Sequence, residues 1–278
     1  MRILLTGPNG FVGARVARAA DCIPCPSLRG ARLEDVLRIV DETRPEAIIH
    51  TAAISDMGAC QRDPESSWRA NVEIPLLLAR SAQSAKLVMF STDQVYNGNS
   101  NPGPYREDEP ISPVNVYARH KAEMEQRVLE LRPDAVMLRA TWMYDMPLYR
   151  GDNRGNFLMN IIKASLAGRP AAWSKQEFRG VTYVREAAEK ALNAVQLPGG
   201  IYNFGSETTL TMYETAQSLL RQLGIQGSPE ESGIGRNLWM DGEKLRRHGM
   251  IEYTEVRNFA QGEEEWASHR DSATMDVA

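Results

Sequence analysis

The sequence has little of what marks secreted, membrane-spanning or nucleic-acid-binding proteins. It contains three cysteines, too few and too odd in number for a disulfide framework. No apolar run approaches the roughly 20 residues that cross a bilayer, and Met1-Arg2 leads at once into a short strand-like run rather than a signal peptide. The net charge of -4 gives no broad attraction for phosphate backbones or anionic lipid. We therefore expect a cytoplasmic globular protein with no nucleic-acid or membrane partner.

Metal-binding and dithiol patterns are also scarce. Cys22 and Cys25 have the C-x-x-C spacing that redox dithiols share with half of many zinc sites. They lie in a short apolar segment after a predicted helix, whereas a redox dithiol normally lies at a helix N-terminus, and no second C-x-x-C follows. The histidines are scattered without ligand spacing, at His50, His120, His248 and His269. We predict structural or surface roles for these side chains and no metal site.

What the sequence does contain is an alternation of short apolar runs and amphipathic stretches. The expected strands are 2–6, 46–51, 86–91, 134–138 and 201–204, and the expected helices are 11–20, 33–43, 67–83, 114–131, 157–167, 184–195 and 212–223. Such an alternation is typical of an α/β protein with a parallel sheet. We predict a Rossmann-type doubly wound parallel sheet over 1–145, to which 178–204 returns, and a smaller C-terminal α/β substrate portion made of 146–177 and 205–278.

A glycine-rich turn follows the first expected strand. Its three glycines have the spacing G-x-x-G-x-x-G between a strand and a helix. In that place backbone N–H groups approach a pyrophosphate, and a β-carbon would block either the turn or the approach. We predict that this turn binds a dinucleotide through Gly7, Asn9, Gly10, Phe11, Val12 and Gly13.

The choice between the two nicotinamide dinucleotides depends on the region after the first helix. A carboxylate about 20 positions beyond the glycines would hold ribose hydroxyls and select NAD, but no carboxylate occurs there before Glu34. Arg29 or Arg32, together with Ser27, could instead meet a 2′-phosphate, because a guanidinium binds phosphate in a bidentate fork. This pattern favours NADP(H), with NAD(H) as the alternative.

Tyr117 and Lys121 form the candidate proton-transfer pair. Ser112-Pro113 is a typical helix start, so the two side chains are expected one turn apart on the same helix face. A phenol has a pKa near 10, and a neighbouring ammonium is expected to lower it by stabilising the phenolate. A hydroxyl of Ser91-Thr92, at the end of an expected strand, could hydrogen-bond the same substrate oxygen. The three parts together predict acid–base chemistry on a substrate oxygen.

These motifs occur in the order and spacing of a known family. The chain resembles the extended short-chain dehydrogenases, and among them is most similar to the dTDP-4-dehydrorhamnose reductases. The stretches that carry the resemblance are the glycine turn, His50-Thr51-Ala52-Ala53, Asn71, Ser91-Thr92-Asp93, Tyr117-x-x-x-Lys121, Arg139-Ala140-Thr141-Trp142-Met143-Tyr144 and Gly155-Asn156-Phe157.

The resemblance implies an NAD(P)H-dependent reductase that acts on the 4-keto group of a nucleotide sugar. Tyr117 would give a proton to the keto oxygen as the nicotinamide delivers hydride to the carbon, with Thr92 and Lys121 completing the catalytic triad. It also implies that the cofactor contacts Ala52, Ala53, Ser91, Tyr117 and Lys121. The substrate contacts that it implies are Thr92, Asp93, Trp142, Asn156 and Arg236.

Two stretches depart from the family pattern. Residues 234–236 stand where the family usually has Arg-Pro, which moves the expected diphosphate contact to Arg236, and residues 176–182 replace a more regular Phe-Gly-Ser-Pro-Thr. The alternatives are therefore a nucleotide-sugar epimerase or dehydratase, or a non-catalytic regulatory subunit that keeps the dinucleotide as a structural ligand. A homodimer is a further expectation for this chain.

Overall fold

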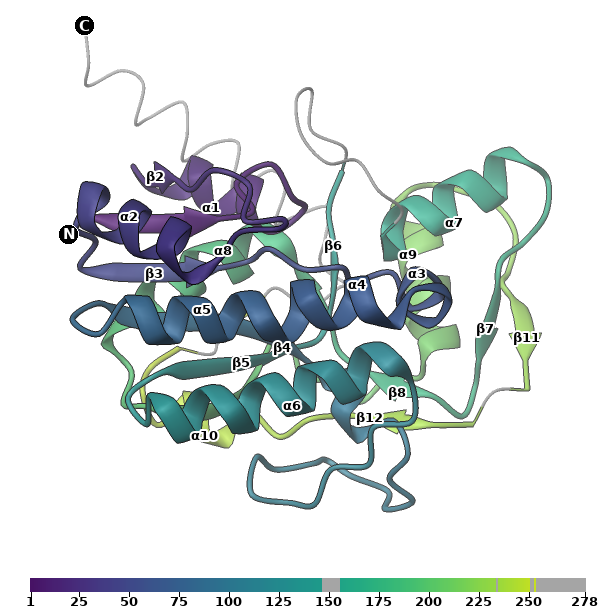
Figure 1. Cartoon of the computed structure of the whole chain (residues 1–278). Coiled ribbons are helices and arrows are strands. Elements are labelled where there is room, and N and C mark those ends of the chain that lie inside the picture. Colours follow the sequence, from purple (N-terminus) through teal and green to yellow (C-terminus); the bar gives the residue numbers. More distant parts are fainter. Residues whose placement is uncertain (147–155, 234, 251–252, 254–278) are drawn as a thin grey trace, which may run out of the picture.

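A six-stranded parallel sheet forms the centre of the molecule (Figure 1). This computed structural model describes residues 1–146, 156–233, 235–250 and 253. The strand order is β10-β5-β4-β3-β1-β2, and every neighbouring pair is parallel. The strands are β1 (Ile3–Thr6), β2 (Ile23–Pro24), β3 (Ala47–His50), β4 (Lys86–Thr92), β5 (Val136–Ala140) and β10 (Gly200–Phe204). The predicted Rossmann-type parallel sheet is confirmed.

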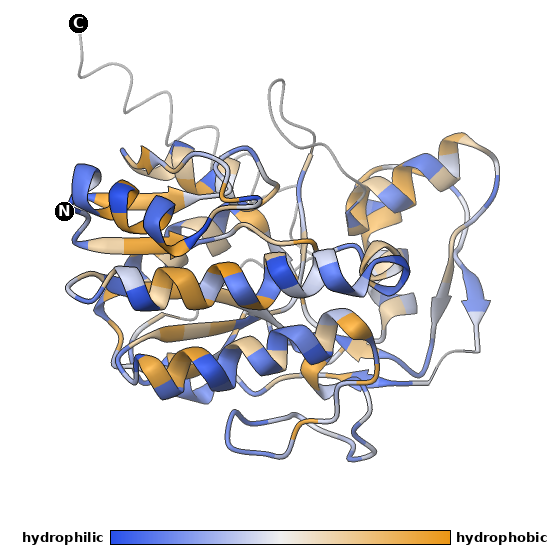
Figure 2. Ribbon diagram, viewed as in Figure 1, coloured by the Kyte–Doolittle hydropathy of each residue, from blue (hydrophilic) through white to orange (hydrophobic). Residues whose placement is uncertain are grey.

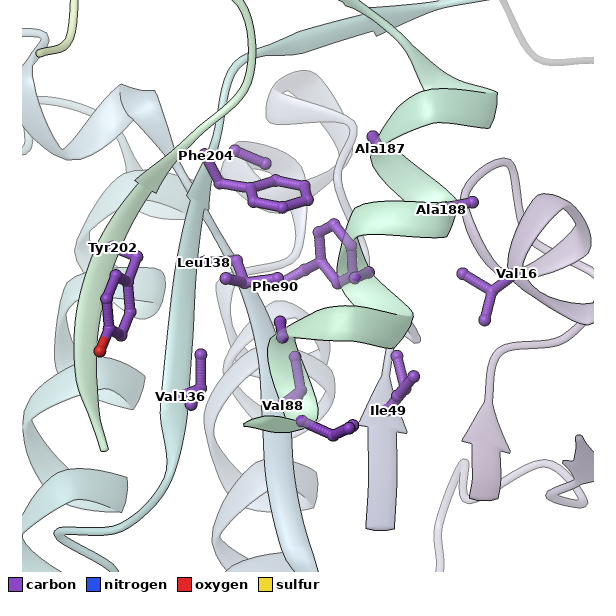
Figure 3. Close-up of a cluster of buried hydrophobic side chains, with 14 of the residues drawn as sticks. Val16, Ile49, Val88, Phe90, Val136, Leu138, Ala187, Ala188, Tyr202 and Phe204 are labelled. Carbon is purple, nitrogen blue, oxygen red and sulfur yellow. The ribbon is translucent and has the colours of Figure 1, made fainter. Parts of the chain in front are cut away.

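Helices cover both faces of the sheet because successive strand residues point to opposite sides. Ile3 and Leu5 of β1 pack toward α1 (Gly13–Ala19) and α8 (Val184–Asn193), where small alanine side chains of α8 let the helix approach Phe90 and Phe204 (Figure 3). Leu4, between them, packs on the other face. That face is covered by α2 (Leu33–Thr43), α5 (Ile74–Ser81) and α6 (Val116–Leu131).

The expected helix over 67–83 is interrupted. It consists of α4 (Pro64–Trp68), a π-helical turn (Arg69–Glu73) and α5, and α3 (Met57–Arg62) precedes it. Asp63 caps α4 by accepting a hydrogen bond from Ser66 N at 3.0 Å. Pro75 lacks the N–H that would continue the α-helical pattern, which accounts for the local change of helix type.

The expected helix start at Ser112-Pro113 was wrong. Helix α6 begins at Val116, and its N-cap is Asn115, whose side chain accepts from Ala118 N at 2.8 Å. Ser112 instead donates its N–H to Val95 O at 2.9 Å, which holds it in the loop after β4. Tyr117 and Lys121 both remain within α6.

A second, smaller hydrophobic cluster lies beyond the carboxyl edge of the sheet. Its helices carry both apolar and polar residues (Figure 2), and apolar ones among them form the buried cluster. It is built around α7 (Phe157–Leu166) and α9 (Met212–Gln222), with short strand pairs between β6 (Trp142–Tyr144) and β9 (Val181–Tyr183), and between β7 (Ala172–Ser174) and β11 (Glu230–Ser232). The remaining elements are β8 (Phe178–Arg179) paired with β12 (Asn237–Leu238), α10 (Glu243–Arg246), and the 3-10 turns Asp93–Tyr96 and Ala194–Gln196.

The predicted division into a cofactor portion and a substrate portion stays a prediction. The return of 178–204 to the sheet is seen directly, because β10 pairs with β5. Residues 147–155, and most of the chain after 250, lie outside the described residues. No helix in the described ranges is long and apolar enough to cross a membrane.

Candidate functional site

The glycine turn, residues 7–13, packs directly against the end of β3. Gly7 has φ +67°, and a β-carbon there would lie 2.8 Å from Ala52 N. A β-carbon on Gly13 would lie 2.0 Å from Gly7 O. Gly10 N donates to Gly7 O at 2.9 Å and closes the turn. The two outer glycines are thus required by the turn itself, and Ala52, a predicted cofactor contact, lies against it.

The rest of the turn differs in exposure. Asn9 is exposed, while Phe11 and Val12 are half-buried and pack against the cluster between the sheet and α8. Asn9 is therefore the side chain of the turn most open to a ligand. Ala53, the residue after Ala52, is also half-buried.

Thr6 and His50 fix the crossing between β1 and β3 beneath this turn. Thr6 Oγ1 hydrogen-bonds His50 Nδ1 at 2.8 Å, and Thr51 Oγ1 donates to Thr6 O at 2.7 Å. Burial, together with the nearby ammonium of Lys121, lowers the pKa of His50 to about 3. His50 is therefore a neutral structural residue, as its lack of ligand spacing predicted.

A buried ionic cluster of Arg15, Asp145 and Arg185 anchors helix α1. Arg15 lies 3.0 Å from Asp145, which also takes Arg185 at 3.1 Å. The Arg15 guanidinium donates to the carbonyls of Phe11 and Met146 at 3.0 and 3.1 Å. A carbonyl of the glycine turn is thereby tied to the residues that follow β6. Sequence reasoning missed this cluster because its partners are far apart in the chain.

Ser27 and Arg29 follow β2, the strand next to β1, and both side chains are exposed. Ser27 Oγ accepts from Arg29 N at 3.4 Å. The two residues are therefore at the same sheet edge as the glycine turn and accessible to a ligand.

Cys22 and Cys25 flank β2, and burial raises the pKa of both thiols, that of Cys25 to about 11. This shift disfavours the reactive thiolate.

The hydroxyls of Thr92 and Tyr117 meet at the end of β4. The Thr92 hydroxyl interacts with that of Tyr117 and favours the phenolate, which acts to lower the pKa of Tyr117. Burial of that hydroxyl, followed by the carboxylate of Asp93, acts in the opposite direction and raises the pKa of Tyr117 above its ordinary value. Tyr117 is consequently protonated at neutral pH.

Lys121 is fully buried behind this pair, and its ammonium donates to Phe90 O at 2.7 Å. Burial lowers its pKa to about 8, against the opposing influence of Glu125 and Cys60. The expected lowering of the pKa of Tyr117 is not found. Helix spacing places Tyr117 and Lys121 on one face, but desolvation and the Asp93 carboxylate raise the pKa of Tyr117 overall.

Asp93 is fully buried and paired with a residue that the sequence did not single out as functional. Arg179 of β8 donates to both of its carboxylate oxygens, at 2.5 and 2.9 Å. The same guanidinium lies over the ring of Trp142, 5.1 Å from its centroid. Trp142 is half-buried and also packs on Phe157 and Trp173. The ion pair joins the end of β4 to the small strand pair β8–β12.

Ser91 is turned away from the glycine turn. Its hydroxyl donates to Glu125 Oε1, and Glu125 accepts a bidentate pair of bonds from Arg139, the closest at 2.8 Å. Arg139 also donates to Tyr96 Oη at 2.6 Å. The side chain of Ser91 therefore belongs to a buried polar network within the sheet edge.

The remaining predicted substrate residues are committed to contacts within the protein. Asn156 caps α7 by accepting from Met159 N at 3.1 Å and donates to Asp145 O at 3.0 Å. Arg236 is partly exposed and pairs with Glu177 at 2.7 Å. Among the described residues, neither side chain hydrogen-bonds Thr92 or Tyr117.

The loop after β3 is held by Asn71 of the π-helical turn. Its side chain accepts from Ile54 N at 3.1 Å and donates to Ile54 O at 2.9 Å and to Ser67 Oγ at 3.2 Å. Cys60 is buried beside this clamp and donates to Ile54 O at 3.3 Å. Asn71 therefore fixes the backbone that follows Ala52 and Ala53.

The fold and the site together define a Rossmann-type α/β protein with a glycine turn and a tyrosine–lysine helix at one sheet edge. The chain belongs to the RmlD substrate binding domain family, whose model matches residues 1–236. This membership confirms the predicted resemblance to the extended short-chain dehydrogenases and dTDP-4-dehydrorhamnose reductases.

Individual relatives agree with the family. The dTDP-4-dehydrorhamnose reductase of Aggregatibacter actinomycetemcomitans is 26% identical over 81% of this chain and 80% of its own. Methionine adenosyltransferase 2 subunit beta of Danio rerio is 27% identical over 82% of this chain and 75% of its own. The structure of dTDP-4-dehydrorhamnose reductase from Bacillus anthracis, a complex with NADP, has a TM-score of 0.81, covers 92% of this chain and 95% of that one, and is 22% identical. The last comparison supports the fold.

Proposed function

We propose that this chain is an NAD(P)H-dependent reductase of a 4-keto nucleotide sugar, with Tyr117 as the proton donor. The observation that carries the proposal is the placement of Tyr117 beside Thr92 at the end of β4, with the buried Lys121 one turn further along α6 and bonded to Phe90 O of the same strand. The glycine turn lies at the same edge of the sheet, because β1 and β4 are parallel strands separated only by β3. Family relatives named as dTDP-4-dehydrorhamnose reductases support the substrate class.

The residues present fit a dinucleotide. A tight turn with glycine at positions 7, 10 and 13 opens helix α1, and an anion at such a helix start is favoured by backbone N–H groups and the helix dipole. The exposed Ser27 and Arg29 would hold a 2′-phosphate, which favours NADP(H) over NAD(H). When bound, the nicotinamide supplies the hydride.

Each residue of the triad then has a separate task. Tyr117, which the raised pKa keeps protonated at neutral pH, gives its proton to the sugar keto oxygen. Thr92 donates a hydrogen bond to the same oxygen and orients it. Lys121 holds a positive charge behind the pair, which stabilises the phenolate once the proton has left. We further propose that Trp142, Asn156 and Arg236 border the sugar and the diphosphate.

The test is NADPH consumption with a panel of dTDP-4-keto-6-deoxy sugars. Wild-type protein should oxidise NADPH with at least one sugar, and Tyr117→Phe should lower kcat by at least about 100-fold because the proton donor is lost. Cofactor fluorescence should show that Tyr117→Phe still binds NADPH. Folded, cofactor-bound wild type that turns over no sugar in the panel would remove the proposal. Turnover of a sugar without net NADPH consumption would identify an epimerase or dehydratase instead.

A regulatory subunit is the second candidate. Its support is the similarity to the methionine adenosyltransferase 2 subunit beta, together with the departure of residues 176–182 from the reductase pattern. A regulator would bind its partner equally well with Tyr117 or with Phe at this position. Loss of NADPH oxidation in Tyr117→Phe separates the enzyme from the regulator.

A further inference from the structure

Arg179 reaches from the small β8–β12 pair into the proposed catalytic site. Its guanidinium takes both oxygens of Asp93, at 2.5 and 2.9 Å, and stacks on Trp142. The side chain is 10% exposed and its partner carboxylate is 0% exposed, so the pair is shielded from solvent. A charge pair in this environment acts strongly on its neighbours because water does not screen it.

The neighbour that matters is Thr92. Its hydroxyl donates to Asp93 Oδ1 at 3.2 Å and accepts from Gln94 N at 3.2 Å, and it also influences the pKa of the neighbouring Tyr117. A hydroxyl has a single proton to donate. While that proton is directed at Asp93, Thr92 cannot donate to a substrate oxygen.

We propose that Arg179 is a positioning residue of the reaction, which by occupying both oxygens of Asp93 weakens the hold of this carboxylate on the Thr92 proton, so that the keto oxygen of a bound substrate can take the hydrogen bond. The proposal rests on the proposed reductase function. The Thr92–Asp93 bond is the longest of the three that Asp93 accepts from these two side chains, which agrees with a weak hold on the hydroxyl. Without the guanidinium, a buried and unpaired carboxylate would bind the Thr92 proton far more strongly.

The same ion pair governs the charge around Tyr117. The groups that face its hydroxyl are Asp93 and Cys60, which raise its pKa, and Arg179 and the Thr92 hydroxyl, which lower it. Loss of Arg179 removes a favourable charge and leaves the carboxylate of Asp93 unbalanced. The pKa of Tyr117 should then rise, which makes it a weaker proton donor.

Three variants separate this role from a structural one. Arg179→Met should lower kcat by about 100-fold, the scale on which a mispositioned acid–base group acts, with the KM for NADPH unchanged. Asp93→Asn combined with Arg179→Met removes both charges and should recover at least about tenfold of that loss, because a neutral amide holds the hydroxyl less tightly. Arg179→Lys should fall between wild type and Arg179→Met, because it keeps the charge without the bidentate fork.

The matched control is Arg132→Met. Arg132 is also buried and paired, with Asp134 at 2.8 Å, but it follows the C-terminal end of α6, away from Tyr117 near its start. Arg132→Met should lower the Tm and leave kcat and its pH profile unchanged. If Arg179→Met behaves like Arg132→Met, or if the double variant is as impaired as Arg179→Met, the proposal is overturned.

A readout without turnover distinguishes this inference from the proposed function. A polyfluorinated tyrosine at position 117, whose phenol is intrinsically more acidic, is titrated by fluorine NMR in the cofactor-free protein. Its pKa should rise in Arg179→Met and return in the double variant, and an unchanged pKa overturns the coupling. Wild type that reduces no sugar overturns the proposed function, while this titration still decides whether Arg179 controls the site.

Discussion

Acidification should destabilise this protein through His50. The ring is 1% exposed, and its pKa is lowered from 6.5 to about 3 by burial and by Lys121. The unfolded chain therefore binds a proton at a higher pH than the folded chain does, so the free energy of unfolding falls as the pH drops below 6.5. The difference corresponds to about 5 kcal/mol when complete, of which about 2 kcal/mol is lost between pH 7 and pH 5.

The assay is urea unfolding followed by circular dichroism at several pH values. His50→Asn keeps a polar atom near Nδ1, which hydrogen-bonds Thr6, but does not titrate. Carboxylates contribute equally to both proteins, so wild type should lose about 2 kcal/mol more than His50→Asn over this range. His248→Asn, at an exposed histidine, should keep the wild-type slope. Equal slopes in wild type and His50→Asn would refute the reasoning.

Three further predictions concern the turn, the lysine and the buried ion pair. A β-carbon at position 13 would lie 2.0 Å from a backbone oxygen, so Gly13→Ala should weaken dinucleotide binding and lower stability by about 1–3 kcal/mol or more. Gly233 has open space around it, and Gly233→Ala should change neither property. Fluorescence titrations measure the binding, and thermal melts measure the stability. The pKa of Lys121 is lowered to about 8, so this residue should raise the free energy of unfolding by about 2 kcal/mol between pH 8 and pH 10. If the unfolding free energy of Lys121→Met rises with pH as steeply as that of wild type, the prediction is contradicted. Glu125→Gln leaves the Arg139 guanidinium, which is 4% exposed, without its carboxylate and should cost about 3–5 kcal/mol in urea unfolding, and a loss below about 1 kcal/mol would argue against it.

The elements that sequence analysis predicted well have a strong local signal. Helix α2 occupies the expected residues 33–43, because its sequence is amphipathic and its N-terminus is capped: the Asp35 side chain accepts from Arg32 N at 3.0 Å. Strand β2 and the pairs outside the main sheet were not predicted, since two or three residues show no periodicity. The π-helical turn was not predicted for a different reason: its sequence is amphipathic throughout, and Pro75 alone indicates that the α-helix is interrupted.

Only the site residues that belong to recognisable sequence motifs could be predicted. The spacing of Tyr117 and Lys121, and the strand end at Thr92, placed these residues at one edge of the sheet. Arg179 could not be found in the same way, because its partner Asp93 lies 86 residues earlier and the pair forms only when β8 docks on the sheet edge. The direction of the pKa shift of Tyr117 was predicted wrongly for a similar reason, because the shift depends on burial and on Asp93.

The ionic cluster behind the glycine turn has a consequence for the order of folding during synthesis. Arg15 leaves the ribosome early, but Asp145 follows 130 residues later and Arg185 later still. Contacts between such distant positions form late, because long loops must close first. Strand β1 and helix α1 are therefore made at the start of translation, and the anchor of the turn between them is completed only after α8 has emerged. A nascent chain arrested before residue 185 should bind dinucleotide poorly, even though every residue of its glycine turn is already present.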